Sequence, residues 1–131
     1  MSEATVGSEM SPEVLTIEPG RTLQQAAAAM TKAGVGAVVV IDPDQPGPGI
    51  VTERDISRVV GEGKDPSKEC VGDHTSTNAA YSHPDWPLDD AVRTMRDRGF
   101  RHLVVVDGCD LVGIVSMRDV VRRWSEERGV T

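Results

Sequence analysis

GIVTERD, residues 49–55, recurs later in the chain as GIVSMRD, residues 113–119. Both copies keep Gly-Ile-Val, then a hydroxyl residue, one variable position and Arg-Asp. An apolar run that ends in a hydroxyl residue, with a carboxylate three positions further on, is typical of a strand that leads into a capped helix. The sequence therefore predicts the same strand-to-helix corner twice.

The repeat extends over nearly the whole chain of 131 residues. LQQAAAAMTKAGVGAVVVID (23–42) lies over LDDAVRTMRDRGFRHLVVVD (88–107) without a gap, at an offset of 65 residues. The offset becomes 64 at the two GIV segments because the intervening turns differ by one residue. Repetition on this scale predicts two copies of one structural unit. The predicted boundaries are a first repeat at 6–61, a linker at 62–70 and a second repeat at 71–127.

Each repeat is predicted to run strand, helix, strand, strand, helix. Apolar residues spaced i, i+3, i+4 and i+7 predict helices that start at Leu23 and Leu88, with Gly34 and Gly99 placed to end them. The continuous apolar run at 37–41 is typical of a buried strand. The expected strands are 14–17, 37–41, 50–52, 79–82, 103–106 and 111–115, and the last helices start at Glu53 and Met117.

This order of elements predicts an α/β (α+β) fold with two β-α-β-β-α units. One unit of about 60 residues buries too little surface to be stable by itself. We therefore expect the two units to pack sheet to sheet about a pseudo-twofold axis.

Composition and charge exclude several classes of protein. The chain is 38% apolar and 27% charged, with a formal net charge of −7, which argues against a nucleic-acid partner. The N-terminus MSEATVGSEM lacks a basic region followed by an apolar one, and no apolar run approaches the roughly 18 residues of a membrane span. We therefore expect a cytoplasmic protein without membrane contact.

Catalytic and metal chemistry have little support in the sequence. The histidines accompany no nucleophile motif, and the chain has no Walker-type phosphate loop, so we do not expect an enzyme. Cys70 and Cys109 follow no disulfide spacing and are expected to stay reduced. Cys70 and His74 are too small a set of ligands to indicate a metal site.

The two hydroxyl-carboxylate pairs, Thr52 with Asp55 and Ser116 with Asp119, admit two interpretations. They could be helix caps, each contributing about 1 kcal/mol to stability. Alternatively, the helix N-terminus could attract a phosphate while the carboxylate accepts the hydroxyls of a ribose. A cap and a ligand contact are compatible, so both interpretations stay open.

The repeated segments resemble a tandem pair of CBS domains, a Bateman module of the stand-alone bacterial type. GVGAVVVIDPDQPGPGIVTERD in the first copy and GFRHLVVVDGCDLVGIVSMRD in the second carry the resemblance. It implies dimerisation and the binding of AMP, ADP, ATP or S-adenosylmethionine between the repeats, with no required cofactor. It also implies that Asp119, Ser116, Asp55 and Thr52 contact ribose and phosphate.

Further contacts follow from the same resemblance. A basic residue often precedes the second strand and meets phosphate, and Arg101 and His102 stand there, although a solvated strand entrance is the alternative. The first copy has Gly36-Ala37 at this place. Arg118 and Arg54 are further phosphate candidates that could instead be plain surface residues. The first strand of each copy would flank the base, through Thr16, Ile17, Ala80 and Tyr81.

The expected function is a non-catalytic module that senses an adenosine nucleotide, works as a homodimer and regulates a protein partner. The alternative is a scaffold that keeps the fold for association and has lost its ligand. We expect the Asp119 site to bind phosphate better, because Met117 stands there where the first copy has Glu53. The apolar stripes expected at the dimer surface are Met117, Val120, Val121 and Trp124, with Ile56, Val59 and Val60.

Overall fold

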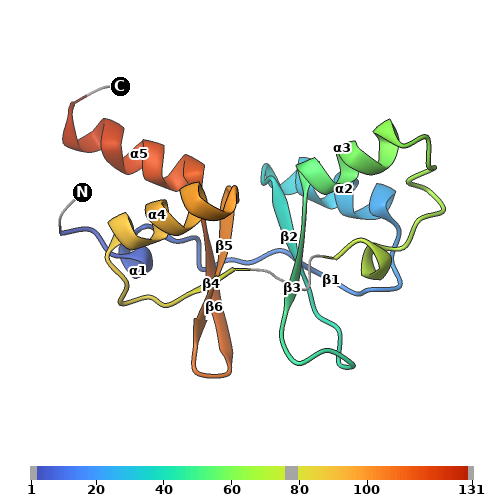
Figure 1. The fold of residues 1–131 in the computed structure, drawn as a ribbon, viewed down its shortest axis with the longest axis horizontal. Coiled ribbons are helices and arrows are strands. Elements are labelled where there is room, and N and C mark those ends of the chain that lie inside the picture. The colour runs from blue at the N-terminus through green and yellow to red at the C-terminus, as the bar shows by residue number, and fades with distance from the viewer. Residues whose placement is uncertain (1–2, 76–79, 130–131) are drawn as a thin grey trace. The chain divides into compact units, whose positions relative to one another are not determined.

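The computed structural model describes residues 3–75 and 80–129, and it divides the chain into two compact units (Figure 1). One unit, here called the central unit, is Leu15–Ala79. The other joins Met1–Val14 to Ala80–Thr131 and is here called the C-terminal unit. The compact units thus differ from the sequence repeats, because the start of the chain packs with its end.

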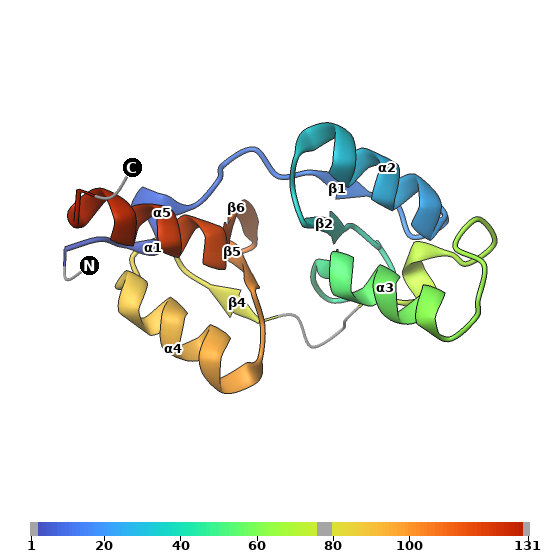
Figure 2. The same cartoon turned by 90° about the horizontal axis from the view of Figure 1, so that it is seen from above.

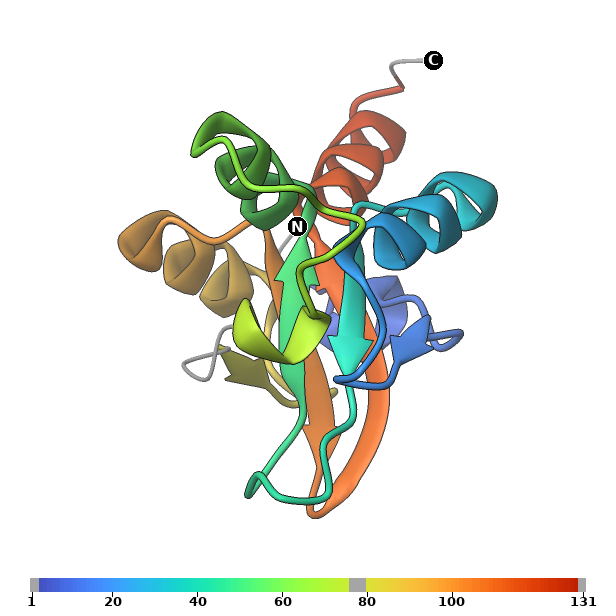
Figure 3. The same cartoon turned by 90° about the vertical axis from the view of Figure 1, so that its right-hand side faces the viewer.

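The central unit contains a three-stranded sheet in the order β1-β2-β3 (Figure 3). Strand β2 pairs parallel with β1 and antiparallel with β3, in a register that places Ala37 opposite Thr52. Helix α2 ends at Gly34, whose φ of 69° lies in the left-handed region that glycine adopts without strain. The elements are β1 (Thr16–Ile17), α2 (Leu23–Ala33), β2 (Ala37–Val40), β3 (Gly49–Thr52), α3 (Glu53–Gly61) and the 3₁₀ turn η1 (Val71–Asp73).

The C-terminal unit repeats this arrangement with the sheet order β4-β5-β6. Helices α4 and α5 cover one face of the sheet, where Leu103, Val105 and Val115 pack with Leu88 and Met95 (Figure 2). Gly99 ends α4 with a φ of 68°. The elements are α1 (Val6–Glu9), β4 (Tyr81–Ser82), α4 (Leu88–Arg98), β5 (His102–Asp107), β6 (Asp110–Ser116) and α5 (Met117–Glu127).

Most of the predicted elements are confirmed. Helices start at Leu23, Glu53, Leu88 and Met117, as the sequence predicts. The strand predicted at 14–17 is shorter than expected, since only Thr16 and Ile17 pair with β2. The strand predicted at 79–82 contains Tyr81 and Ser82, and position 79 lies outside the described residues. The short elements α1 and η1 were not predicted.

The N-terminal segment completes the C-terminal unit by backbone hydrogen bonds. The Val6 N–H donates to the Trp86 carbonyl at 2.9 Å, and the Gly7 N–H donates to the Pro84 carbonyl at 2.8 Å. Ser11 then pairs antiparallel with Ile114 on β6. These bonds join segments more than 75 residues apart and add an extra stretch of backbone to the sheet edge.

A close approach at Gly113 makes this packing tight. A Cβ atom at Gly113 would lie 2.7 Å from the Met10 sulfur and 2.8 Å from the Ser11 carbonyl oxygen. Both distances are too short for real atoms, so the N-terminal segment can lie against β6 only where the strand carries glycine.

The central unit is completed in the same way by the segment that follows α3. The Val71 N–H donates to the Arg21 carbonyl at 2.7 Å, and the Gly72 N–H donates to the Pro19 carbonyl at 2.9 Å. Each donor and each acceptor here lies 65 positions from its counterpart in the bonds that Val6 and Gly7 donate to Trp86 and Pro84. The stretch predicted as a linker is likewise packed, because the Glu69 carbonyl accepts the first N–H of α2, from Leu23, at 2.9 Å.

Candidate functional site

The corner between β6 and α5 is built around a buried carboxylate, Asp119, with 9% of its surface exposed. Its Oδ2 accepts the Ser116 N–H at 2.7 Å and the Ser116 hydroxyl at 3.0 Å. In return the Ser116 Oγ accepts the Asp119 N–H at 3.3 Å. The capping interpretation is therefore confirmed at this corner, and the cap fixes the carboxylate at the start of an 11-residue helix.

The corner between β3 and α3 has the same construction. Asp55 Oδ2 accepts the Thr52 N–H at 2.8 Å and the Thr52 hydroxyl at 3.1 Å. The Asp55 N–H donates to the Thr52 hydroxyl oxygen at 3.4 Å, which completes the cap. Both corners therefore hold a carboxylate where a helix begins and where the helix dipole favours negative charge.

An arginine one turn later binds the second oxygen of each carboxylate. Arg122 donates from Nη1 to Asp119 Oδ1 at 3.2 Å, and Arg58 donates from Nη2 to Asp55 Oδ1 at 2.8 Å. These arginines were not among the predicted site residues. The signal was available, because Asp-x-x-Arg occurs at the same place in both repeats.

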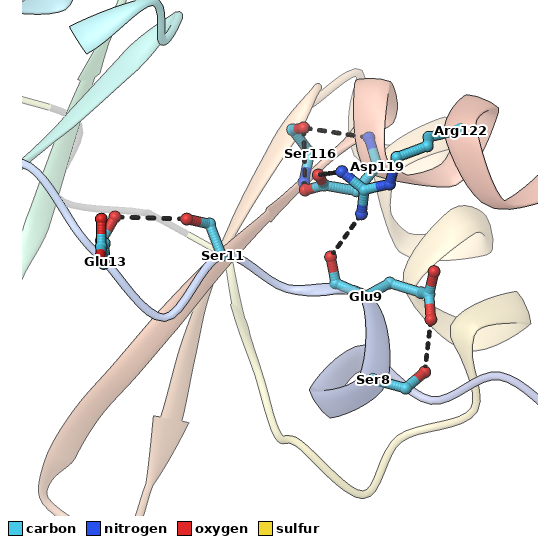
Figure 4. Close-up of polar contacts among 7 residues, drawn as sticks. All are labelled: Ser8, Glu9, Ser11, Glu13, Ser116, Asp119 and Arg122. Carbon is cyan, nitrogen blue, oxygen red and sulfur yellow. Dashed lines mark hydrogen bonds and ion pairs between the residues drawn. The ribbon is translucent and has the colours of Figure 1, made fainter.

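Arg122 also ties the Asp119 corner to the N-terminal segment (Figure 4). Its Nη2 donates to the backbone carbonyl of Glu9, at the end of α1, at 3.2 Å. The buried Glu9 carboxylate accepts the Ser8 hydroxyl at 2.7 Å and lies 3.6 Å from Arg123 Nη1. One guanidinium thus bridges a candidate ligand-binding carboxylate and Glu9 of the N-terminal segment, 113 positions earlier in the chain.

The structure places Arg101 and His102 beside the Asp119 corner. The Arg101 carbonyl accepts the first N–H of α5, from Met117, at 2.8 Å, and His102 pairs directly with Ser116 across the strands. Arg118 is exposed in the first turn of α5. The backbone thus holds Arg101 and His102 next to the start of α5, and Arg118 lies in its first turn.

The Asp55 corner has the same backbone but a different charge. The Gly36 carbonyl accepts the Glu53 N–H at 3.0 Å, in the position equivalent to Arg101. Glycine and alanine replace the basic pair, and Glu53 adds an exposed carboxylate. Arg54 is exposed in the first turn of α3 and is the only one of the four phosphate candidates at this corner.

The candidates for contact with a base divide into two kinds. Tyr81 pairs with Val104, two positions from His102, so its side chain shares a sheet face with His102 and Ser116. Thr16 shares the corresponding face with Thr52. Of the other two, Ala80 is buried in the core of its unit and Ile17 is partly buried against the core of its unit, so their side chains are less exposed than those of Thr16 and Tyr81.

Metal binding and membrane crossing have no structural counterpart in the described part of the chain. Across 3–75 and 80–129, no three His, Cys, Asp or Glu side chains are grouped to hold a metal ion. His74 instead places its Nε2 3.2 Å from Glu69 Oε1. Within the same ranges, no helix combines the length and apolar character needed to cross a membrane.

The two matching units and their capped corners define a tandem α+β module, and comparison with known proteins assigns its class. The CBS domain model matches residues 5–62 and 71–126. The chain therefore belongs to the CBS-domain family and contains two CBS domains, as the resemblance predicted. CBS pairs are generally regulatory, ligand-binding domains rather than catalytic ones.

Individual relatives agree with this class. The chain is 34% identical to the CBS domain-containing protein YhcV of Bacillus subtilis over 126 residues, 95% of this chain and 89% of the relative. A solved CBS-domain protein from Burkholderia ambifaria matches with a TM-score of 0.89 and 28% identity, over 98% of both chains. Other curated relatives are longer, and the chain spans 63% of one from Methanopyrus kandleri.

One solved relative contains a nucleotide. The CBS domain protein PAE2072 from Pyrobaculum aerophilum, in complex with AMP, matches with a TM-score of 0.79 and 27% identity. The match covers 88% of this chain and 89% of that one. The fold of the present chain is therefore one on which an AMP complex has been observed.

Proposed function

We propose that this chain is a regulatory module that binds an adenosine nucleotide at the corner formed by Ser116 and Asp119. The observation that carries the proposal is the buried Asp119 carboxylate, held at a helix start beside Arg101, His102 and Arg118. The AMP complex of the Pyrobaculum aerophilum relative supports the same class of ligand.

The chemistry of the corner suits the two polar parts of a nucleotide. A carboxylate that is already fixed by a cap keeps its position when ribose hydroxyls bind to it, which lowers the entropic cost of binding. The N-terminus of α5 and the neighbouring Arg101 and Arg118 supply positive charge for phosphate. Tyr81, on the same sheet face as Ser116, offers an aromatic ring to the base.

The Asp55 corner is a second and weaker site in this proposal. Thr52 and Asp55 reproduce the geometry of the Ser116 and Asp119 corner, and Arg54 stands in the first turn of α3 as the candidate for phosphate. Glu53, however, adds a carboxylate where the Asp119 corner has the uncharged Met117. Repulsion between Glu53 and a phosphate disfavours a charged ligand there.

A module that binds a nucleotide without converting it can act only by regulating another protein. The ligands considered are AMP, ADP, ATP and S-adenosylmethionine, and the module would report cellular energy or metabolite state to a protein partner in the cytoplasm. A ligand can change such a partner only through different affinities for two states of the module. No cofactor or catalytic step is part of the proposal.

Thermal denaturation with AMP tests the proposal. A ligand present at 100 times its Kd stabilises the native state by about 2.7 kcal/mol, so the melting temperature of a chain of this size should rise by several degrees. ADP, ATP and S-adenosylmethionine are compared in the same assay. If none of the four compounds moves the midpoint at millimolar concentration, the binding proposal is wrong for this chain.

The scaffold alternative is favoured by one observation, the exposed apolar residues on α3 in one unit and on α5 in the other. Val60 and Val121 are each 54% exposed and Trp124 is 43% exposed, whereas Val59 and Val120 on the same helices are buried. Val121 and Trp124 stand three positions apart on α5 and are therefore neighbours on its surface, and adjacent exposed apolar side chains are typical of an association surface.

We therefore expect a homodimer at micromolar concentration in sedimentation equilibrium. Val121→Glu combined with Trp124→Glu should convert it to a monomer, because burying those charges without partners is costly. A wild-type monomer at these concentrations would contradict both the homodimer and the scaffold function.

A further inference from the structure

We propose that Arg122 sets the affinity and the sugar specificity of the Asp119 site, because it occupies a carboxylate position that a ribose needs. The proposal rests on the nucleotide-binding function and adds a residue to it. It further implies that ligand binding is felt by the N-terminal segment, to which Arg122 is also bonded.

Hydrogen bonds from Ser116 and Arg122 already occupy most of the acceptor positions of the Asp119 carboxylate. An ionised carboxylate has about four lone-pair positions for hydrogen bonds. Oδ2 accepts two donors from Ser116, and Oδ1 accepts Arg122 Nη1. With these three donors from the described residues in place, one position remains, whereas the two hydroxyls of a ribose bring two donors. The second hydroxyl can therefore bind Asp119 only by taking the place of Arg122.

Arg122 is the donor that a ligand can displace from Asp119. Its side chain is 51% exposed, and its bond to Asp119 is 3.2 Å long, beyond the usual range for a charge-assisted bond. A pair of this kind contributes little to stability in water. The two Ser116 donors, in contrast, belong to the cap that starts α5. A ribose thus displaces the guanidinium and leaves the helix start unchanged.

Displacement of Arg122 reaches the N-terminal segment through Glu9. Without its anchor on Asp119, the guanidinium is no longer held in place to donate to the Glu9 carbonyl. Val6 and Gly7 keep α1 attached through their own backbone bonds. Loosening is therefore local and falls on Met10 and Ser11, the residues that follow Glu9 and lie against Gly113.

Calorimetric titration with AMP and 2′-deoxy-AMP tests the role of Arg122. The two ligands share base and phosphate, so the ratio of their Kd values reports only the missing hydroxyl. Arg122→Met removes the competing donor from Oδ1 while keeping a good helix former. The preference for AMP over 2′-deoxy-AMP should rise about two- to fivefold in this variant. This range is the free energy of an exposed ion pair expressed as a ratio of Kd values.

Arg58→Met is the matched control, because Arg58 donates a hydrogen bond to Asp55 as Arg122 does to Asp119. It should leave the preference at the wild-type value. An unchanged preference in Arg122→Met, with AMP still bound, overturns the role of Arg122 and leaves nucleotide binding intact. A rise in Arg58→Met instead overturns it by moving the ligand to Asp55. Absence of binding to wild type and both variants overturns the proposal together with the function.

Amide hydrogen exchange tests the link to the N-terminal segment. The Met10 N–H donates to Val6 and the Ser11 N–H donates to Ile114, so both amides report the packing of this segment. AMP should accelerate their exchange in the wild type, and Arg122→Met should show fast exchange before any ligand is added. Unchanged exchange at Met10 and Ser11 in saturating AMP would overturn the link.

Discussion

Asp119→Asn is expected to weaken AMP binding at least tenfold and to destabilise the ligand-free protein. An amide has one acceptor oxygen, and its NH₂ group would face either the Ser116 N–H or the Arg122 guanidinium, both of which are donors. Hydrogen bonds to a charged group contribute about 1.5–3 kcal/mol each, and about 1.4 kcal/mol corresponds to a tenfold change in Kd. Calorimetry with AMP measures the affinity, and thermal denaturation without ligand measures the stability lost with the helix cap.

Asp55→Asn separates the two effects of this substitution. It damages the equivalent cap of α3, where Asp55 accepts from Thr52, and should cost about the same stability, about 1 kcal/mol. Its affinity for AMP should stay close to that of the wild type. If Asp55→Asn loses AMP and Asp119→Asn retains it, the nucleotide belongs to the central unit.

Val6→Ala is expected to lower the free energy of unfolding by about 2 kcal/mol, the cost of two buried methyl groups and the cavity that they leave. Val6 is fully buried in the core of the C-terminal unit, with Leu88 and Met95. Although Val6 lies in the first sequence repeat, the damage should fall on the second. Native-state hydrogen exchange should therefore show faster opening of α4 and α5.

Val71→Ala is the matched substitution, because Val71 is equally buried in the core of the central unit. It should accelerate exchange in α2 and α3. The two variants together test whether the segments at 6–9 and 71–73 each stabilise the unit that they pack with. If Val6→Ala loosened α2 and α3 while α4 and α5 stayed protected, the assignment of the N-terminal segment to the C-terminal unit would be wrong.

The sequence predicted the parts of the fold that local chemistry controls. The starts of α3 and α5 follow from Thr52 and Ser116, whose side chains bond to backbone only three residues away. Gly34 and Gly99 end helices because the left-handed turn there suits glycine. The strands at 14–17 and 79–82 were less predictable, since two paired residues are too few to establish an alternating pattern.

The candidate site could be predicted only in part. The capping pairs were visible because hydroxyl and carboxylate stand at a fixed spacing in both repeats. The packing of Ile17 and Ala80 against the cores of their units was not, because a short strand does not reveal which of its faces meets the helices. The pairing of Arg122 with Asp119 could have been predicted from the repeated Asp-x-x-Arg spacing, but its bond to the Glu9 carbonyl could not, because no sequence pattern marks a backbone acceptor.

By itself, the sequence determined that this protein has two copies of one α+β unit, each with a carboxylate fixed at a helix start. These features depend on contacts within a few residues or on a repeat that can be counted. Only the tertiary structure decided that Val6 and Gly7 bond to Trp86 and Pro84 of the other repeat. Backbone groups are alike in every residue, so pairing between distant segments depends on the fold that brings them together.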